Sequence, residues 1–146
     1  MAPTIRPVRA ADSAAVASLT GELGYPATTE EMAARIDAIL QRPGEHALLV
    51  AVDVDDVPIG WIHVERLDTL ETPPMAGIAG LVVGEGSRSD GIGTALLAAG
   101  EAWARDQGLG VIQVRSRTTR ERAHRFYERA GYERVKVSAV FRKPLE

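Results

Sequence analysis

The sequence predicts a single α/β (α+β) domain in which about four helices flank a sheet of about six strands. Runs rich in β-branched residues alternate with runs whose apolar residues recur every three or four positions, as strands alternate with helices. Of the 146 residues, 45% are hydrophobic and 25% charged, the balance of a folded globule. No repeat, low-complexity tract or charge block divides the sequence, so we expect one domain over residues 1–146.

The N-terminal third predicts one strand and two helices. Residues 5–9 are compatible with a short strand, and Asp12 then occupies an N-cap position before a helix that Gly24 ends. Thr28 and Glu31 have the spacing of a capping box, which predicts that a second helix follows directly. The apolar faces of the two helices consist of Val16, Leu19 and Leu23, and of Met32, Ile36 and Ile39.

The middle of the chain predicts three strands. Residues 47–53 and 59–65 are rich in β-formers, and the turn-forming segment between them has hairpin length, so they should pair antiparallel. A polar loop over 67–74 ends in two prolines. The apolar run 75–83 that follows is a candidate for a buried strand.

The C-terminal part predicts a helix, a strand, a helix and a last strand. The first helix should begin at Ile92 and end near Gly108, with a strand over 111–116 behind it. The second helix should end at Gly131, a natural C′ residue, and apolar residues then alternate over 135–141. This last strand could pair within the domain or across a homodimer, because both arrangements use the same pattern.

Composition and charge exclude several classes of protein. The chain has no cysteine, which excludes disulfides, Cys-based zinc sites and a thiol nucleophile, and we assign no metal ligands. A net charge of -3 gives no reason to bind nucleic acid or an anionic membrane. No signal-peptide pattern and no run of ~20 apolar residues is present, so we expect a cytoplasmic protein.

A glycine-rich segment over residues 84–94 joins a buried-strand candidate to the helix that begins at Ile92. Its glycines would let backbone N–H groups converge on an anion, and the helix start adds unpaired N–H groups. The segment is not a Walker A motif, because Ile92 replaces the required lysine, nor a dinucleotide fingerprint, because Leu96 replaces the third glycine. Alone, it is explained equally well as a tight structural turn.

Two motifs follow one another in the C-terminal half of the chain. Residues 83–93 read Val-x-x-x-x-Arg-x-x-Gly-x-Gly, and residues 123–132 read Ala-x-x-Phe-Tyr-x-x-x-Gly-Tyr. In this order they resemble the acetyl-CoA pyrophosphate signature and the second motif of the GNAT superfamily of N-acetyltransferases. The resemblance covers nearly the whole chain and implies a mixed, mostly antiparallel sheet. Within the superfamily, the sequence is similar to the small bacterial proteins grouped with aminoglycoside 6′-N-acetyltransferases.

The resemblance implies that acetyl-CoA is the co-substrate and that its acetyl group passes directly to a primary amine of a small molecule or peptide. The backbone of Leu81 and Val83 would pair with the pantetheine arm, and residues 88–94 would hold the pyrophosphate. Tyr127 would be the catalytic residue, donating its phenolic proton to the leaving thiolate. The cofactor-binding residues implied are Leu81, Val82, Val83, Arg88, Ser89, Asp90, Gly91, Ile92, Gly93 and Thr94.

Two residues depart from the family pattern. Asp90 puts a negative charge beside the expected pyrophosphate, so its side chain should point away. Arg120 stands where many relatives have an asparagine that contacts the cofactor, although an arginine could still reach a phosphate. The stretch 76–78, where relatives often have a carboxylate that serves as base, has none.

The general base is therefore unassigned, with His63, Glu65 and Glu71 as candidates. His46 and His124 look like surface residues without a partner. The spacing of Tyr127 alone predicts a core tyrosine, and only the motif makes it catalytic. The alternative function is a non-catalytic acyl-CoA-binding sensor or partner-binding module: Tyr127 argues against it, and the missing base argues for it.

Overall fold

The computed structural model describes residues 3–88 and 90–146, in two compact units that divide after Val114. The elements of the first unit are β1 (Thr4–Pro7), η1 (Ala10–Asp12), α1 (Ser13–Glu22), α2 (Thr29–Leu40), β2 (His46–Val52), β3 (Pro58–Leu67), β4 (Met75–Val83), η2 (Glu85–Ser87), α3 (Ile92–Asp106) and β5 (Ile112–Val114). The second unit contains α4 (Glu121–Arg129).

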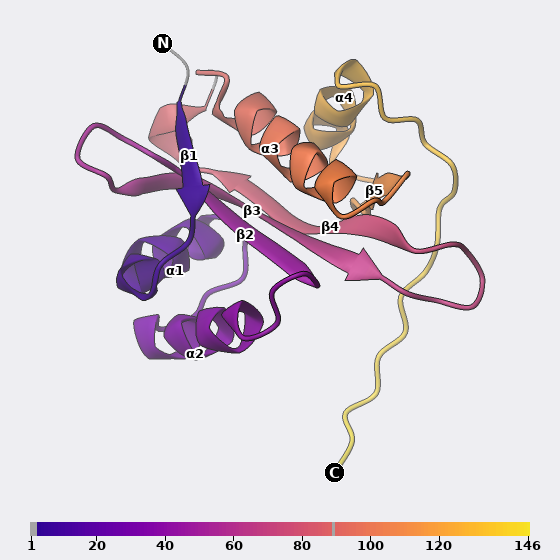
Figure 1. Cartoon of the computed structure of the whole chain (residues 1–146), viewed down its shortest axis with the longest axis horizontal. Helices are drawn as coiled ribbons and strands as arrows, with labels where there is room; N and C mark the ends of the chain where they lie inside the picture. Colours follow the sequence, from indigo (N-terminus) through magenta and orange to yellow (C-terminus); the bar gives the residue numbers. More distant parts are fainter. Residues whose placement is uncertain (1–2, 89) are drawn as a thin grey trace. The chain divides into compact units, whose positions relative to one another are not determined.

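The sheet of the first unit has the strand order β1-β2-β3-β4-β5. The first four strands pair antiparallel, whereas β4 and β5 pair parallel. Helices α1 and α2 cover one face of this sheet and α3 covers the other (Figure 1). The predicted α/β class with a mixed, mostly antiparallel sheet is therefore confirmed.

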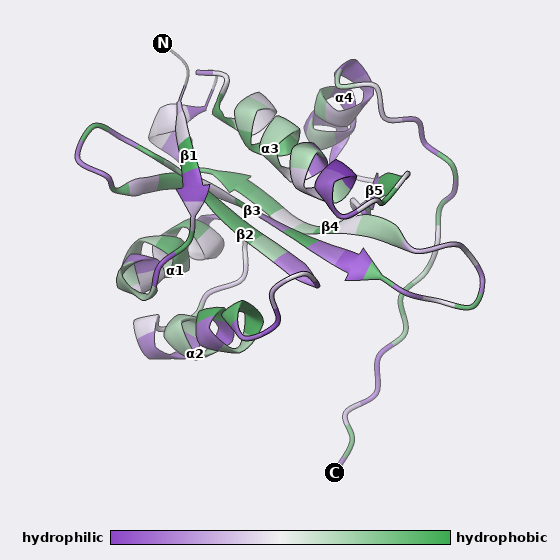
Figure 2. Ribbon diagram, viewed as in Figure 1, coloured by the Kyte–Doolittle hydropathy of each residue, from purple (hydrophilic) through white to green (hydrophobic). Residues whose placement is uncertain are grey.

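The two faces of the sheet follow from the alternation along β3. Ile62 and Val64 are fully buried and face α3, whose Gly100 lets the helix approach closely: a Cβ there would come within 2.9 Å of a Val64 methyl. Trp61 faces the other way and packs against the core under α1 and α2. Figure 2 shows how the hydrophobic parts of the strands give way to a hydrophilic end of β3.

Helix α2 begins as the sequence predicts. The Thr28 hydroxyl accepts a hydrogen bond from Glu31 N–H at 3.0 Å, and the Glu31 carboxylate accepts one from Thr28 N–H at 2.9 Å. Both members of a capping box are thus satisfied at the surface. The apolar residues Met32 and Ile36 then face the core.

Asp12 precedes α1, but its side chain does not cap that helix. Its carboxylate instead accepts two hydrogen bonds from the Arg6 guanidinium, at 2.8 and 3.0 Å, and one from Arg9 N–H at 2.7 Å. The Asp12 and Arg6 side chains are only 6% and 11% exposed. Asp12 therefore stands at the predicted N-cap position, but its carboxylate is engaged by a bidentate, charge-assisted pair with Arg6 instead of by an N–H group of α1.

The strand predicted over residues 135–141 is not formed, so the sheet has five strands rather than about six. The chain after Gly131 is neither helix nor strand, and Val135, Val137 and Phe141 are 83%, 64% and 93% exposed. A strand needs a neighbour to pair with. The second unit, which is described in full, offers only α4, so alternation alone does not make a strand there.

Among the described residues, no helix is both long enough and apolar enough to cross a membrane.

Candidate functional site

The second half of β4 pairs on one side only in the first unit. Its parallel partner β5 pairs with residues 76–78 and goes no further. At this point the register with β3 also shifts, from His63 opposite Gly80 to Val64 opposite Ile78, which leaves Ala79 as a bulge. Residues 79–83 therefore present the backbone groups that point away from β3 as a free edge, which an extended molecule could pair with.

The three residues predicted to contact the cofactor at this edge differ in which of their groups a ligand can reach. Val82 is 5% exposed and lies opposite Trp61, so its side chain belongs to the core and only its backbone remains for a ligand. Leu81 and Val83 are half-buried. The Val83 carbonyl accepts a 3.3 Å hydrogen bond from Arg88 Nε, which folds the guanidinium back over the end of the strand.

The glycine-rich segment has a satisfied part, in which the backbone N–H groups donate to other protein groups, and an open part, in which they do not. Gly84 N–H donates to Ile59 O at 2.8 Å, Glu85 N–H to a Glu22 carboxylate oxygen at 2.9 Å, and Ser87 N–H to Gly84 O at 2.9 Å. These N–H groups are therefore engaged within the protein. An anion would have to bind further along the segment.

The open part is the start of α3. Gly91 is the N-cap with φ of +76° and provides no side-chain cap, and its carbonyl accepts the first helical hydrogen bond, from Ala95. The N–H groups of Ile92, Gly93 and Thr94 make no hydrogen bond to another described residue. Three free N–H groups at the positive end of a helix are a site for a phosphate. Asp90 is exposed nearby, and Ser89 lies outside the described residues.

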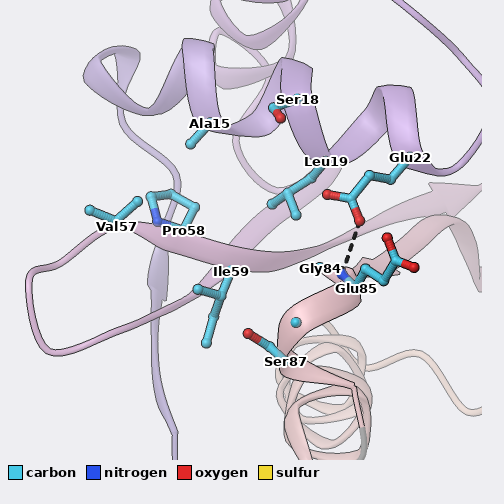
Figure 3. A pocket seen from close by; sticks show the side chains of 11 residues that line it. Ala15, Ser18, Leu19, Glu22, Val57, Pro58, Ile59, Gly84, Glu85 and Ser87 are labelled. Carbon is cyan, nitrogen blue, oxygen red and sulfur yellow. Dashed lines mark hydrogen bonds between the residues drawn. The ribbon is translucent and has the colours of Figure 1, made fainter.

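A pocket of about 370 Å³ lies beside the satisfied part of the segment (Figure 3). It is bordered by α1, by the start of β3 and by residues 84–87. The carboxylates of Glu22 and Glu85 lie within it, and the Glu22 carboxylate accepts the Glu85 N–H. Two carboxylates disfavour a phosphate here, so the pocket and the anion site at α3 are separate.

Tyr127 lies in the second unit, where its backbone closes α4. Gly131, with φ of +97°, donates its N–H to Glu128 O, and Tyr132 donates its N–H to Tyr127 O at 2.9 Å. These two bonds form a Schellman motif, and the accompanying contact is between the rings of Tyr127 and Tyr132, 5.6 Å apart. The spacing Tyr-x-x-x-Gly-Tyr is therefore the structural end of a helix, whatever the phenol does.

The phenol of Tyr127 is half-buried, and this burial raises its pKa, an effect partly opposed by the charge of Arg120. The group therefore stays protonated at neutral pH and remains a hydrogen-bond donor. Arg120 is the N-cap of α4 without a side-chain cap bond. A guanidinium has no acceptor atom, so unlike an asparagine it cannot cap the helix.

The structure places two of the candidate bases, His63 and Glu65, on one face of β3 and the third, Glu71, in the loop that follows. His63 is half-buried on the face of the sheet under α1 and α2, and burial, with a smaller contribution from His46, lowers its pKa to about 4. Its imidazole is therefore neutral at pH 7. Glu65 lies two residues further on the same face, whereas Glu71 is exposed in the 68–74 loop and Asp68 is paired with Arg66 at 3.1 Å.

All three histidines have partners that the sequence pattern missed, including the two predicted to have none. His46 Nδ1 lies 2.9 Å from His63 Nε2. His124 donates from Nε2 to Arg117 O at 2.8 Å, and its Nδ1 then accepts from Arg134 at 2.9 Å. The prediction of lone surface histidines is therefore wrong. For His46 the signal was the hairpin, whose pairing brings the start of one strand to the end of the next.

Comparison with known proteins identifies the family to which this chain belongs. A model of the Acetyltransferase (GNAT) family matches residues 14–132. The chain belongs to this family. An aminoglycoside N(6′)-acetyltransferase type 1 from Stenotrophomonas maltophilia is 31% identical over 147 residues, which cover 99% of this chain and 95% of that protein. The resemblance predicted from the two motifs is confirmed, and the chain is an N-acetyltransferase with acetyl-CoA as its acetyl donor.

Solved structures share the fold of this GNAT acetyltransferase. AAC(6′)-Iy in complex with the bisubstrate analogue CoA-S-monomethyl-acetylneamine has a TM-score of 0.84 at 19% identity, covering 99% of this chain and 100% of that one. A glucosamine-6-phosphate N-acetyltransferase from Arabidopsis thaliana has a TM-score of 0.83 at 16% identity, covering 97% and 99%. Proteins named for different acceptors fit equally well, so the fold does not select the amine.

Proposed function

We propose that residues 1–146 act as one domain that transfers an acetyl group from acetyl-CoA to the primary amine of a small molecule of the aminoglycoside class. One observation carries the cofactor part of this proposal. In the first unit, an edge of β4 over residues 79–83 that pairs on one side only is followed by a helix start whose first three N–H groups bond to no other described residue. The acceptor class is supported by the 31% identical relative.

The two features match the two ends of a CoA arm. The pantetheine arm carries amide groups, which can pair with an exposed strand edge as a further strand would. The N–H groups of Ile92, Gly93 and Thr94 would hold the pyrophosphate, and the Arg88 guanidinium at the end of β4 would add charge. Asp90 would contribute its backbone and not its side chain, and Ser89, the other residue predicted there, lies outside the described residues.

The chemistry that follows is direct transfer. The unprotonated amine attacks the thioester carbonyl, the C–N bond forms, and the C–S bond breaks to release CoA as a thiolate. Tyr127, proposed as the general acid, donates its phenolic proton to that sulfur. The nitrogen loses one proton to solvent as the amide forms, and a proton from solvent restores the phenol. Without cysteine the chain has no thiol to carry an acetyl group, so no acetyl-enzyme is expected.

Replacing Gly91 by valine should weaken CoA binding at least tenfold, or by about 1.4 kcal/mol. Gly91 has φ of +76°, which a β-branched residue avoids, so the backbone must rotate and re-aim the N–H groups behind it. The measurement is calorimetric titration of the full chain with CoA. Gly86→Ala is the control, because Gly86 lies in the same segment with open space around its Cβ and no positive φ. Wild-type protein that does not bind CoA at millimolar concentration would refute the cofactor site.

Acceptor screening tests the function itself. Because the chain has no cysteine, a thiol reagent reads released CoA without background from the protein. The panel should pair aminoglycosides that carry a 6′-amine with those that carry a 6′-hydroxyl, and add polyamines, amino acids and peptide N-termini. We expect turnover with the 6′-amines alone among the aminoglycosides. A protein that binds CoA yet turns over no amine would instead be the acyl-CoA-binding module.

A further inference from the structure

Three side chains able to bind a metal meet on one face of the sheet. His46 begins β2 and lies opposite Glu65 of β3, and His63 precedes Glu65 by two residues on the same face. The Nδ1 of His46, the Nε2 of His63 and a carboxylate oxygen of Glu65 all lie within 4.8 Å of one another. Antiparallel pairing brings directly opposite and diagonal side chains within reach, so the strand register creates this cluster.

We propose that His46, His63 and Glu65 bind a Zn²⁺ ion, independently of the acetyl transfer proposed above. Two imidazoles and one carboxylate are a donor set of three-ligand zinc sites, which leave the fourth position to water or another small ligand. Borderline nitrogen donors with one carboxylate suit zinc better than magnesium or calcium, which prefer oxygen ligands.

The distances fit the ion after a small adjustment. Tetrahedral zinc with Zn–N bonds of about 2.0–2.1 Å holds two nitrogen ligands about 3.3–3.4 Å apart. The two ring nitrogens are now 2.9 Å apart, so they need to separate by roughly half an ångström. Rotation of the side chains provides this, because the backbone positions are fixed by the pairing of β2 and β3.

Hydrogen positions also permit binding. The present contact between the rings holds one hydrogen, since one nitrogen donates and the other accepts. A neutral imidazole can carry its hydrogen on either nitrogen. If His46 carries a hydrogen on Nε2 alone and His63 on Nδ1 alone, both facing lone pairs are free for the ion.

The third ligand is available and the site can be reached. The Glu65 carboxylate makes no hydrogen bond or ion pair with another residue in the described part of the chain. All three side chains are half-buried, so an ion has access but loses part of the competing water. Figure 2 shows this hydrophilic end of β3 beside the beginning of β2.

The test is a titration of the full, tag-free and chelator-treated chain with Zn²⁺ in competition with a chromogenic chelator. We expect one ion per chain with a Kd below about 10 µM. Co²⁺ should replace zinc and give the intense visible bands of a four-coordinate ion, and Zn²⁺ should raise the melting temperature. Binding of several ions at millimolar affinity, or a six-coordinate cobalt spectrum, would overturn the proposal.

Variants locate the ion. His46→Gln and His63→Gln should each weaken zinc binding at least tenfold, and Glu65→Gln, which keeps the side-chain shape, should weaken it by a similar factor. His124→Gln is the matched control, because it removes the third histidine of the chain and lies outside the cluster. Glu65→Gln decides the question if either histidine variant unfolds. Unchanged zinc affinity in a folded Glu65 or histidine variant would disprove the assigned ligands.

Discussion

Replacement of Tyr127 by phenylalanine is expected to lower kcat by about 10²-fold, within the range of general acid catalysis. The change removes only the phenolic oxygen, so the ring still contacts Phe126 and Tyr132, at 5.1 and 5.6 Å between centroids. The Schellman bond uses the Tyr127 carbonyl, which the change leaves in place. Stability should therefore shift by no more than about 1 kcal/mol, the value of one hydrogen bond.

The pKa of Tyr127 also predicts how the activity of the wild type and of Tyr127→Phe depends on pH. Burial raises this pKa above its ordinary value near 10. The phenol of the wild type therefore stays protonated through the assay range, and the activity should not decline between about pH 7 and 9 on its account. This role is supported if kcat of the variant is lower than that of the wild type at every pH while the two pH profiles have the same shape.

Tyr132→Phe is the matched control for Tyr127→Phe. It removes the hydroxyl of the other ring in the same helix cap and should keep kcat within about twofold, because no chemical role is assigned to Tyr132. The measurements are kcat, CoA affinity and melting temperature for the three proteins with the acceptor found by screening. Near-normal kcat for Tyr127→Phe would leave Tyr127 as a structural residue.

Elements whose signals are local could be predicted from the sequence. The capping box of Thr28 and Glu31 needs only its own residues, and it begins α2 as expected. The run 75–83 forms β4 within the predicted bounds, because an apolar stretch between a proline-ended loop and glycine has few alternatives. Gly131 ends α4 with a positive φ for the same local reason.

Features that depend on distant partners could not be predicted in the same way. The alternation over 135–141 gives an apolar face but does not supply the neighbour that a strand requires, and no strand forms. The bulge at Ala79 depends on how β3 and β4 align, which periodicity does not show. It matters for the candidate site, because the free edge of β4 begins there.

The ion pair between Arg6 and Asp12 also joins residues whose pairing the local pattern does not show. Of the changes considered, its loss should have the largest effect on the free energy of unfolding. Asp12→Ala is expected to lower the free energy of unfolding by about 3 kcal/mol, the lower end of the range for breaking a buried pair. The lower end applies because Arg6 keeps Asp56 as a second partner, at 2.9 Å. Denaturant unfolding of both proteins at pH 7 measures the difference, and a loss below about 0.5 kcal/mol, as at an ordinary surface site, would contradict it.

The pH dependence of this loss tests its electrostatic origin. Hydrogen bonds from Arg6 hold the pKa of Asp12 below its ordinary value near 3.8, so the folded state favours the charged carboxylate. The contribution of the pair is therefore present above about pH 4 and is lost as the pH falls through the lowered pKa. The stability difference between wild type and Asp12→Asn should be constant from pH 5 to 8 and shrink below about pH 4. Asp55→Asn, an exposed change in the turn between β2 and β3, is the control for the loss of one carboxylate charge. A difference for Asp12→Asn that persists unchanged to pH 2 would mean that packing, rather than charge, makes Asp12 important.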